Sequence, residues 1–400
     1  MDTLLFKVSD GQLDSDYVTV TLAVTATPGG TDPGSPPTVP GLPPVTLPPT
    51  VPGVPGVPPA VPGVPPAVPP GVPGGPTPPL TARATLVSSP TSGSAVTVVT
   101  DTGVVRSSLF PLDAVMPGGV RTALADVNGD GTPDYVAGSG PGAASAVAVV
   151  SGATNAPLFR LTPFEGSFTG GVFVAAGDLT GDGVPDIAVS ADQGGGPRVR
   201  IFDGKTQLPV VDFFGIDDRA FRGGARSGFG DVTGDGKLDL IVAAGFGGGP
   251  RVTVWDGQSL LARAPRQVAN FFAFEPSLRN GVYVAAGNFV GNDGKADIVV
   301  GAGPGGGPRV SVFSGSLLGQ GTPQRSADFF SGDVTSRGGV SVAAKPGTNG
   351  DTLITGDGPS DAVSRLRAYA APALVASPNA PSTTFDIEPL DGNASGIFVG

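Results

Sequence analysis

The stretch Asp178-Leu-Thr-Gly-Asp-Gly-Val-Pro-Asp186 places acidic or hydroxyl oxygens at its first, third, fifth and ninth positions and a glycine at its sixth. Ca²⁺ is held by about six to eight oxygens, and a glycine at this position allows the sharp turn that brings them together. The same pattern recurs in two further stretches, Asp126-Val-Asn-Gly-Asp-Gly-Thr-Pro-Asp134 and Asp231-Val-Thr-Gly-Asp-Gly-Lys-Leu-Asp239. Three copies in register predict a repeated cation-binding loop.

An EF-hand loop shares these nine positions, but it also needs a bidentate glutamate at position twelve and helices on both sides. Position twelve is Ala137, Val189 or Val242 in this chain. The flanks, such as Val172-Phe-Val-Ala-Ala176 and Ile187-Ala-Val-Ser190, are short, apolar and rich in β-branched residues, which is typical of strands. Each loop is therefore predicted to join two strands.

The composition excludes several classes of function. The chain has no cysteine and no histidine, which excludes disulfides and catalysis by Ser-His-Asp or Cys-His groups. A net charge of −11 argues against a nucleic-acid partner, because phosphate recognition needs clustered Lys and Arg. No uninterrupted apolar run approaches the length of a membrane span, so no membrane insertion is expected. The first residues lack the basic start and apolar core of a secretory signal.

Residues 1–80 predict two segments. Residues 1–27 hold two strand-like runs around Asp10-Gly11 and predict a hairpin. This segment resembles the closing strands of cadherin-like or immunoglobulin-like repeats in bacterial surface proteins, which implies a remnant of an upstream repeat; a disordered, strand-prone tail is the alternative. Residues 28–80 are dominated by Val-Pro-Gly and Pro-Pro phrases, which lack the backbone donors of helix and sheet and predict a polyproline or disordered linker.

Residues 81–400 repeat. The first aspartates of the three loops lie at 126, 178 and 231, spacings of 52 and 53 residues, and each unit contains four strand-like runs. Four-stranded units of this length predict an all-β β-propeller. Counting first strands near Val120, Val172, Ala225, Val282, Val340 and Ile397 predicts six blades. The final run Gly396–Gly400 is expected to complete the N-terminal blade and close the ring, which hides its edges.

The units resemble the FG-GAP or VCBS repeats of bacterial surface proteins, which are related to the propeller of integrin α chains. The resemblance implies an extracellular binding module whose loop residues hold Ca²⁺. Thr180 and Thr233 stand where a carboxylate or amide is usual, which predicts weaker second and third sites. A fourth loop at Asn288 carries an insertion, and a fifth begins at Lys345 and is expected to hold no metal. The implied ligands are Asp126, Asn128, Asp130 and Asp134, then Asp178, Thr180, Asp182 and Asp186, then Asp231, Thr233, Asp235 and Asp239.

The loops on the opposite face carry a second periodic pattern. Acidic residues recur seven positions before a first strand, and arginines follow the Gly-Gly-Gly-Pro turns, so ion pairs between blades are expected. Paired carboxylates such as Asp218 and Glu275 are also typical of glycoside hydrolases, but repetition in every blade favours packing, and no catalytic residue is assigned. The loops that vary between units predict a candidate ligand face made of Phe168, Arg219, Phe221, Arg222, Arg279 and Arg337.

These observations predict a non-enzymatic, Ca²⁺-stabilised module for adhesion, recognition or scaffolding with a protein or glycan ligand. It is expected to be a monomeric part of a larger secreted or cell-surface protein; export is implied by the resemblance and by calcium availability. A carbohydrate-active enzyme that uses carboxylates and Ca²⁺, and a purely structural spacer, remain as alternatives.

Overall fold

The computed structural model describes residues 2–6, 18–22, 85–88, 95–112, 116–291, 293–318, 323–360, 362–390 and 392–400. Two compact units divide the chain, Met1–Pro70 and Gly71–Gly400. In the first unit, β1 (Asp2–Phe6) pairs antiparallel with β2 (Val18–Leu22), so residues 1–27 do contain two paired strands. Their origin from an upstream repeat stays a prediction, and the predicted linker at 28–80 lies outside the described residues.

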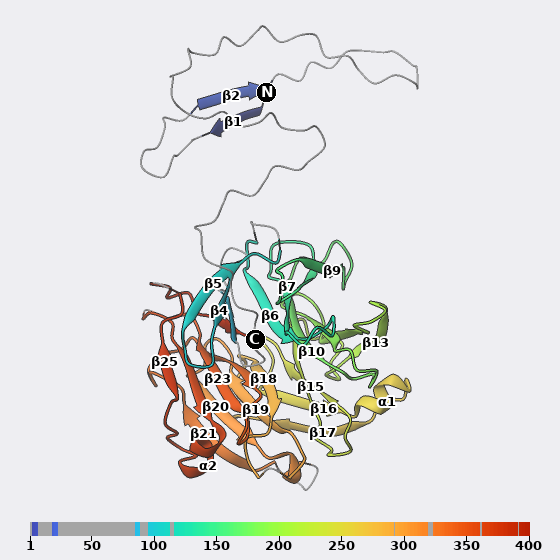
Figure 1. Ribbon diagram of the computed structural model, residues 1–400, viewed down its shortest axis with the longest axis vertical. Coiled ribbons are helices and arrows are strands. Elements are labelled where there is room, and N and C mark those ends of the chain that lie inside the picture. The colour runs from blue at the N-terminus through green and yellow to red at the C-terminus, as the bar shows by residue number, and fades with distance from the viewer. Residues whose placement is uncertain are drawn as a thin grey trace. The chain divides into compact units, whose positions relative to one another are not determined.

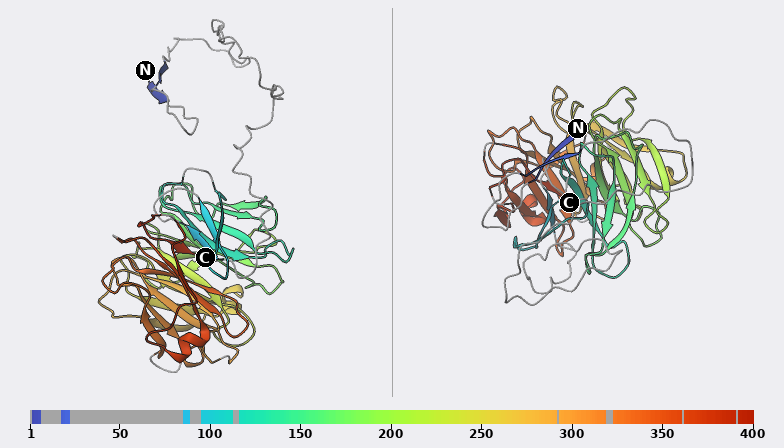
Figure 2. Two further views of the ribbon diagram at one scale, coloured as in Figure 1. Left: turned by 60° about the vertical axis from the view of Figure 1, so that its left-hand side comes forward. Right: turned by 90° about the horizontal axis from the view of Figure 1, so that it is seen from above.

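The second unit is built from four-stranded antiparallel sheets arranged around a common centre (Figures 1 and 2). Five of them are blades, here meaning sheets of four strands that are consecutive along the chain. The strands of the first three blades are β6 (Val120–Ala125), β7 (Asp134–Ser139), β8 (Val147–Val150) and β9 (Pro157–Leu161); β10 (Val172–Gly177), β11 (Asp186–Ala191), β12 (Arg198–Phe202) and β13 (Pro209–Phe214); and β14 (Ala225–Gly230), β15 (Asp239–Ala244), β16 (Arg251–Trp255) and β17 (Gln267–Phe272). Those of the other two are β18 (Val282–Gly287), β19 (Asp297–Ala302), β20 (Arg309–Phe313) and β21 (Arg325–Phe330); and β22 (Val340–Lys345), β23 (Thr352–Asp357), β24 (Leu366–Ala370) and β25 (Phe385–Ile387).

The remaining sheet corrects the predicted blade count. It has the strand order β26-β3-β4-β5 and combines both ends of the unit: β3 (Thr85–Ser88), β4 (Val96–Val99), β5 (Val105–Leu109) and β26 (Phe398–Val399). The prediction of six like blades is wrong: five blades are continuous, and this composite sheet is a different unit. Of the expected strand Gly396–Gly400, only Phe398 and Val399 pair with β3, opposite Ser88 and Val87. The expected pairing between the two ends of the second unit is present, as β26 with β3.

Burial follows the position of each strand within its blade. Every residue of the second strands β7, β11, β15 and β19 is buried, because these strands are covered on both faces by neighbouring sheets. Valine and isoleucine dominate them, and clusters such as Val136, Val174 and Val189 bridge adjacent blades. The first strand of each blade lies at the centre of the ring and pairs with the second in an unbroken six-residue register, as in Val172↔Ala191 to Gly177↔Asp186. The core therefore lies between the sheets.

Short helices join some strands: α1 (Gly257–Leu261), η1 (Gly315–Leu317) and α2 (Ala371–Ala376). Asp256 caps α1, because its carboxylate accepts from the Ser259 amide at 2.7 Å. Among the helices of the described chain, none is both long enough and apolar enough to cross a membrane.

Candidate functional site

The first aspartate of each acidic loop holds the loop backbone. Asp178 Oδ1 accepts from the amides of Gly181 and Asp182 at 2.7 and 3.1 Å, and Oδ2 accepts from Gly183 at 2.9 Å. Asp231 makes the same bonds to residues 234, 235 and 236, and Asp126 bonds the amides of Asp130 and Gly131. Gly183 has a φ of +87°, which favours glycine at the sixth position. The three loops therefore share one backbone geometry.

The ninth aspartate has a different role from the predicted one. Asp134 is fully buried; its Oδ2 accepts from the amides of Val127 and Asn128, and its Oδ1 accepts from Gly152 at 3.0 Å. Those bonds fill about three of the roughly four acceptor positions of a carboxylate. Burial raises the pKa of this carboxyl, and the amide hydrogen bonds oppose that rise. The ninth aspartate is thus an anchor that ties the loop to the turn after the third strand of the same blade.

Equivalent anchors occur in three further blades. Their carboxylates accept from a glycine amide in the turn after the third strand, at Gly204, Gly257 and Gly315. In each case burial raises the carboxyl pKa. The anchors are Asp186, Asp239 and Asp297. Asp297 belongs to the fourth loop, so this loop keeps the anchor although its first residue is Asn288.

The oxygens left for a cation lie at the outer edge of each loop. The first aspartates are half-buried and the fifth, Asp130, Asp182 and Asp235, are exposed. Thr180 directs its hydroxyl to the anchor Asp186 at 3.4 Å. No three Asp, Glu, His or Cys side chains in the described residues lie close enough together to hold a metal ion. The residues therefore fit a partly hydrated ion held by the first and fifth carboxylates with the third residue, and do not fit a fully enclosed ion.

The fourth and fifth loops are bound to each other. Asn288 donates its amide to Asp351 Oδ2 at 2.8 Å, and the Asp351 amide donates to the Asn288 carbonyl at 2.7 Å. Lys345 ends β22 and pairs in register with Thr352, which stands where the other blades have an anchor aspartate. The fifth loop thus lacks both an acidic first residue and the anchor.

A ring of side chains that the sequence analysis missed crosses the centre of the propeller. The first strands β6, β10, β14, β18 and β22 and the run Ile397–Gly400 are here called the inner stretches. The second residue of each points into the channel, and in order around the centre these residues are Arg121, Phe173, Arg226, Tyr283, Ser341 and Phe398. The aromatic rings meet edge to face, with centroids 5.7 Å apart for Phe173–Phe398 and 6.0 Å apart for Tyr283–Phe398. The Arg121 guanidinium lies 4.6 Å from the Phe398 ring, and that of Arg226 lies 3.9 Å from the Tyr283 ring. This central ring fills the channel at one level.

One carboxylate accompanies the two arginines. Arg121 forms a buried ion pair with Asp192 at 3.1 Å and donates to the Gly118 carbonyl at 2.7 Å. Asp192 follows β11 at a position where the other blades have glycine, for example Gly245 and Gly303. The signal was therefore present in the sequence as a departure from the repeat. Sequence alone does not show that this aspartate meets an arginine of the preceding blade, because the two residues lie 71 positions apart.

The opposite face brings together part of the candidate ligand face. Phe168, Arg219 and Arg222 line one hollow of about 240 Å³ with Glu165 and Arg198. Phe221, Arg279 and Arg337 are not part of that hollow. Arg222, Arg279 and Arg337 each donate Nη1 to carbonyls of their own loop, as Arg337 does to Val334 at 2.9 Å and Ser336 at 2.7 Å. These three arginines therefore brace their loops, while their side chains remain exposed.

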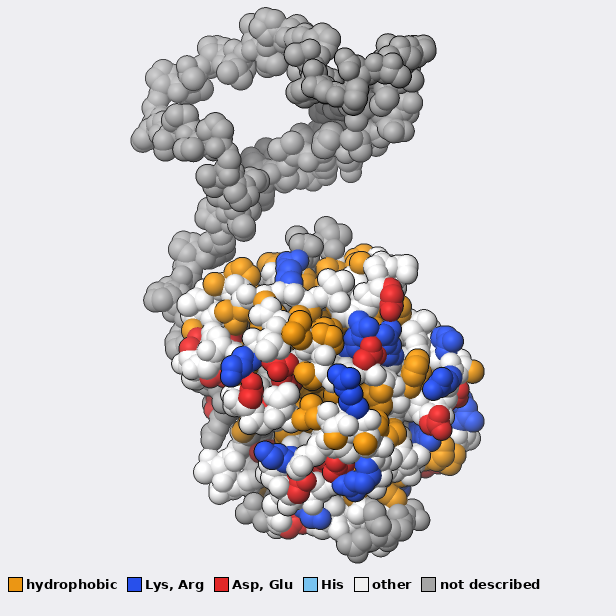
Figure 3. All heavy atoms as spheres, turned by 90° about the vertical axis from the view of Figure 1, so that its right-hand side faces the viewer, with side chains coloured by type: hydrophobic (Ala, Val, Ile, Leu, Met, Phe, Trp, Pro, Cys, Tyr) orange, Lys and Arg blue, Asp and Glu red, His pale blue; other side chains and the backbone are white. Residues whose placement is uncertain are grey.

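The predicted ion pairs between blades form in two places. Arg198 contacts Glu165 and Arg309 contacts Glu275, both at 3.0 Å; Arg251 instead donates to Asn270 at 2.9 Å. The pKa of Glu165 and that of Glu275 are lowered, first by a backbone hydrogen bond and then by the arginine. These two glutamates are therefore engaged by arginines of the next blade. Basic and hydrophobic side chains are interspersed on the side around β13 and α1 (Figure 3).

The Gly-Gly-Gly-Pro turns pack against phenylalanines of the fourth strands. A Cβ at Gly249 would lie 3.0 Å from the Phe272 ring, and one at Gly307 would lie 3.2 Å from the Phe330 ring. Phe271 and Phe329, the first phenylalanines of two pairs, are buried, and Phe213 in the third pair is partly buried; the second member of each pair is about half exposed. The two members of a pair therefore differ in burial: the first packs inward, and the second covers the glycine turn.

Comparisons with known proteins found one family model and several solved structures that are similar to this chain. A model of the FG-GAP-like repeat matches residues 126–189 and 178–242. The Dos1 propeller is similar at 14% identity over 77% of this chain and 71% of that chain, with a TM-score of 0.41. A chain of the mitotic checkpoint complex is similar at 13% identity over 79% and 77%, with a TM-score of 0.44. A rhamnogalacturonan lyase is similar at 13% identity over 68% and 56%, with a TM-score of 0.36. This chain carries FG-GAP-like repeats and has a β-propeller architecture.

Proposed function

We propose that this propeller is a non-enzymatic binding, adhesion or scaffold module, stabilised by Ca²⁺ at its three acidic loops and working at the cell surface or after secretion. A propeller with FG-GAP-like repeats is compatible with a binding or scaffold role. Extracellular modules bind Ca²⁺ at about 10⁻⁴–10⁻³ M, which suits the few outer oxygens of these loops. When bound, the ion would neutralise the first and fifth carboxylates and hold the loop in its turn.

The observation that carries the proposal is the identical geometry of the three loops. Asp126, Asp178 and Asp231 each fix the following backbone by the same amide bonds, which leaves an acidic fifth residue exposed beside them. At the third position of the first loop, Asn128 offers a side-chain amide oxygen. At the third position of the second loop, Thr180 directs its hydroxyl toward the anchor Asp186. The first loop is accordingly expected to bind Ca²⁺ more tightly than the second.

Thermal unfolding of the full chain tests Ca²⁺ binding to the loops. The melting temperature is measured with about 5 mM Ca²⁺, with Mg²⁺ and with chelator. Each site occupied at tenfold its dissociation constant adds about 1.4 kcal/mol, so three sites add about 4 kcal/mol. Asp126→Ala, Asp178→Ala and Asp231→Ala should each remove part of the Ca²⁺-dependent shift, and the triple variant should remove all of it. An unchanged melting temperature with Ca²⁺, or an equal shift in the triple variant, contradicts the proposed sites.

The ligand of the module is proposed to be a protein or glycan that contacts the hollow around Phe168. This hollow offers a half-buried aromatic ring beside the exposed Arg219 and Arg222, and aromatic and arginine side chains dominate binding hot spots. A glycan and protein array probed with the full chain and with Arg219→Ala tests it. Binding that the variant loses supports the hollow, whereas an array without any specific signal favours the structural spacer.

A further inference from the structure

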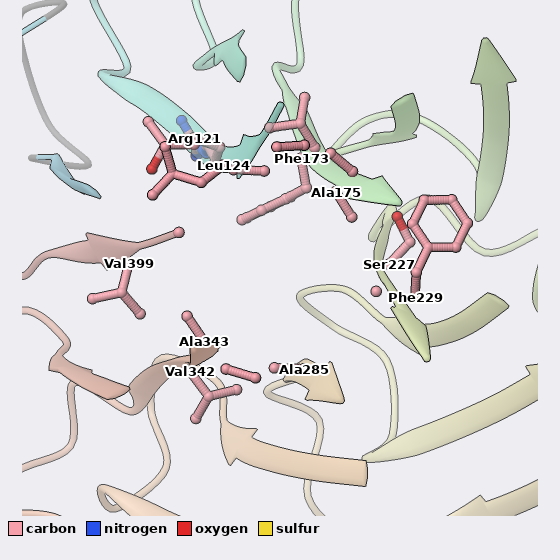
Figure 4. A pocket seen from close by; sticks show the side chains of 18 of the residues that line it. Arg121, Leu124, Phe173, Ala175, Ser227, Phe229, Ala285, Val342, Ala343 and Val399 are labelled. Atoms are coloured by element: carbon pink, nitrogen blue, oxygen red, sulfur yellow. The ribbon is translucent and has the colours of Figure 1, made fainter. Parts of the chain in front are cut away.

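The channel holds a cavity of about 480 Å³ on the acidic-loop side of the central ring (Figure 4). The side chains along its walls are small, so they leave the space open. The fourth residue of every inner stretch is alanine or glycine: Ala123, Ala175, Gly228, Ala285, Ala343 and Gly400. Asp126 and Lys345 lie at its mouth, at the ends of β6 and β22. A volume of this size is within the range of small-molecule sites, about 300–1,000 Å³.

The central ring closes the far end of this cavity. The large side chains Arg121, Phe173 and Arg226 occupy the second positions of their strands, two residues before the small ones. Successive side chains on one face of a strand are two residues apart, so the change from large to small along each strand creates a floor with open space above it. The cavity is thus a property of the strand pattern and not of loop conformation.

The floor carries more positive than negative charge. Arg121 is paired with Asp192, but the described residues place no carboxylate within ion-pair distance of Arg226, whose Nη1 donates to the Val282 carbonyl at 3.0 Å. Arg121 and Arg226 are 6% and 5% exposed, and the Nε atoms of both lack a hydrogen-bond partner. Burial lowers the pKa of Arg121; Asp192 opposes this, and Arg226 adds to it. A buried guanidinium without a carboxylate is costly unless another anion neutralises it.

We propose that the central cavity binds a small organic anion, with its carboxylate directed to Arg226 and its apolar body against the alanine walls. The charge of one carboxylate balances the excess guanidinium on the floor. The side chains of Ala175, Ala285 and Ala343 present only methyl groups. They can therefore pack against any apolar group that is small enough for the cavity. The rings of Phe173 and Tyr283 hold the Arg226 guanidinium in place, at 5.1 and 3.9 Å from their centroids.

Isothermal titration calorimetry of the full chain, in chelator so that the loops hold no metal, tests the proposal with butyrate, cyclohexanecarboxylate and benzoate. The matched uncharged probes are butyramide, cyclohexanecarboxamide and benzamide. At least one carboxylate should bind about tenfold or more tightly than its amide, a difference typical of a hydrogen bond to a charged group. Arg226→Gln should remove that preference, while Arg251→Gln, at a residue outside both the cavity and the hollow whose side chain donates to Asn270, should keep it.

A second pair of variants tests the cavity without touching the arginines. A Cβ on Gly228 would have its nearest neighbours at 3.7 Å, so Gly228→Leu is sterically allowed at its Cβ and fills the cavity. Gly166 is exposed and has no atom within 4 Å of an added Cβ, so Gly166→Leu is the matched control. Carboxylate binding should be lost in Gly228→Leu and kept in Gly166→Leu. If no carboxylate binds better than its amide, or Gly228→Leu binds as the wild type does, the proposal is wrong.

Discussion

The acidic loops and the central ring differ in how they use the repeat. The three acidic loops repeat the first, fifth and ninth aspartates, and in each the first aspartate accepts from the amides of the fifth and sixth residues. The central ring occupies equivalent positions in every inner strand but fills them with arginine, aromatic and serine side chains in turn. The repeated residues hold the same turn in each acidic loop. The residues that differ between the units meet in the channel and create a charge distribution that no single repeat contains. Three substitutions sharpen this contrast.

The largest effect is expected from Asp192→Gly, which gives this blade the glycine of its neighbours. The substitution leaves Arg121 buried beside Arg226 without its carboxylate, and breaking a buried pair in this way costs about 3–5 kcal/mol. Urea unfolding of the full chain measures the loss. The double variant Arg121→Met/Asp192→Gly should recover about half of it or more, because it removes the unpaired charge as well. Equal stability of the single and double variants contradicts a coupled pair.

A smaller loss is expected from Asp186→Ala in a loop anchor. The amides of Thr180 and Gly204 lose their acceptor, and each buried unpaired donor costs about 1–3 kcal/mol, so the free energy of unfolding should fall by about 2–4 kcal/mol. Relief of the buried charge offsets a part of this. Asp182→Ala, at the exposed fifth position, is the matched control and should change stability by less than about 1 kcal/mol in chelator. A larger loss at Asp182 than at Asp186 reverses the assigned roles.

The smallest effect concerns the outer ion pairs. Asp212 accepts from Arg198 and Arg200 at 2.8 Å, and the Arg198 hydrogen bond lowers its pKa, against the effect of burial. A lowered folded pKa contributes stability that is present above the unfolded pKa of about 3.9 and is lost as the pH falls through the folded value. Asp212→Asn should therefore cost about 1 kcal/mol or less at pH 7. This difference should begin to shrink as the pH falls below about 4 and should vanish only once the pH lies below the lowered folded pKa of Asp212.

Much of the fold was readable from the sequence because each unit repeats a strong local signal. The β-branched runs predicted first strands that begin at Val120, Val172, Ala225, Val282 and Val340, as the structure shows. The blade count was less secure, because five blades are continuous and the composite sheet draws on both ends of the unit. The sequence of a short run such as Ile397–Gly400 does not show how many of its residues will pair with a neighbouring strand.

The site was less predictable than the fold. The loop residues were found because acidic side chains and glycine alternate within nine positions, but the burial of the ninth aspartate depends on Gly152, Gly204 and Gly257 in a later turn. The central ring depends on six strands meeting in space, so no local window contains it. Asp192 replaces the glycine of the other units, and Arg121 and Arg226 stand where the other units have aromatic or serine residues, so comparison of the units position by position would have identified them.

The pairing of β26 with β3 has a consequence for how the molecule is made. Ser88 and Phe398 lie more than three hundred residues apart in the chain, and ribosomes add about 5–20 residues per second. The edge of β3 therefore remains without its partner for on the order of tens of seconds after it is synthesised, and an open edge invites pairing with other chains. Phe398 is also part of the central ring. The channel floor is consequently completed only by the last residues of the sequence, so a chain interrupted shortly before its end lacks both the closure and the floor.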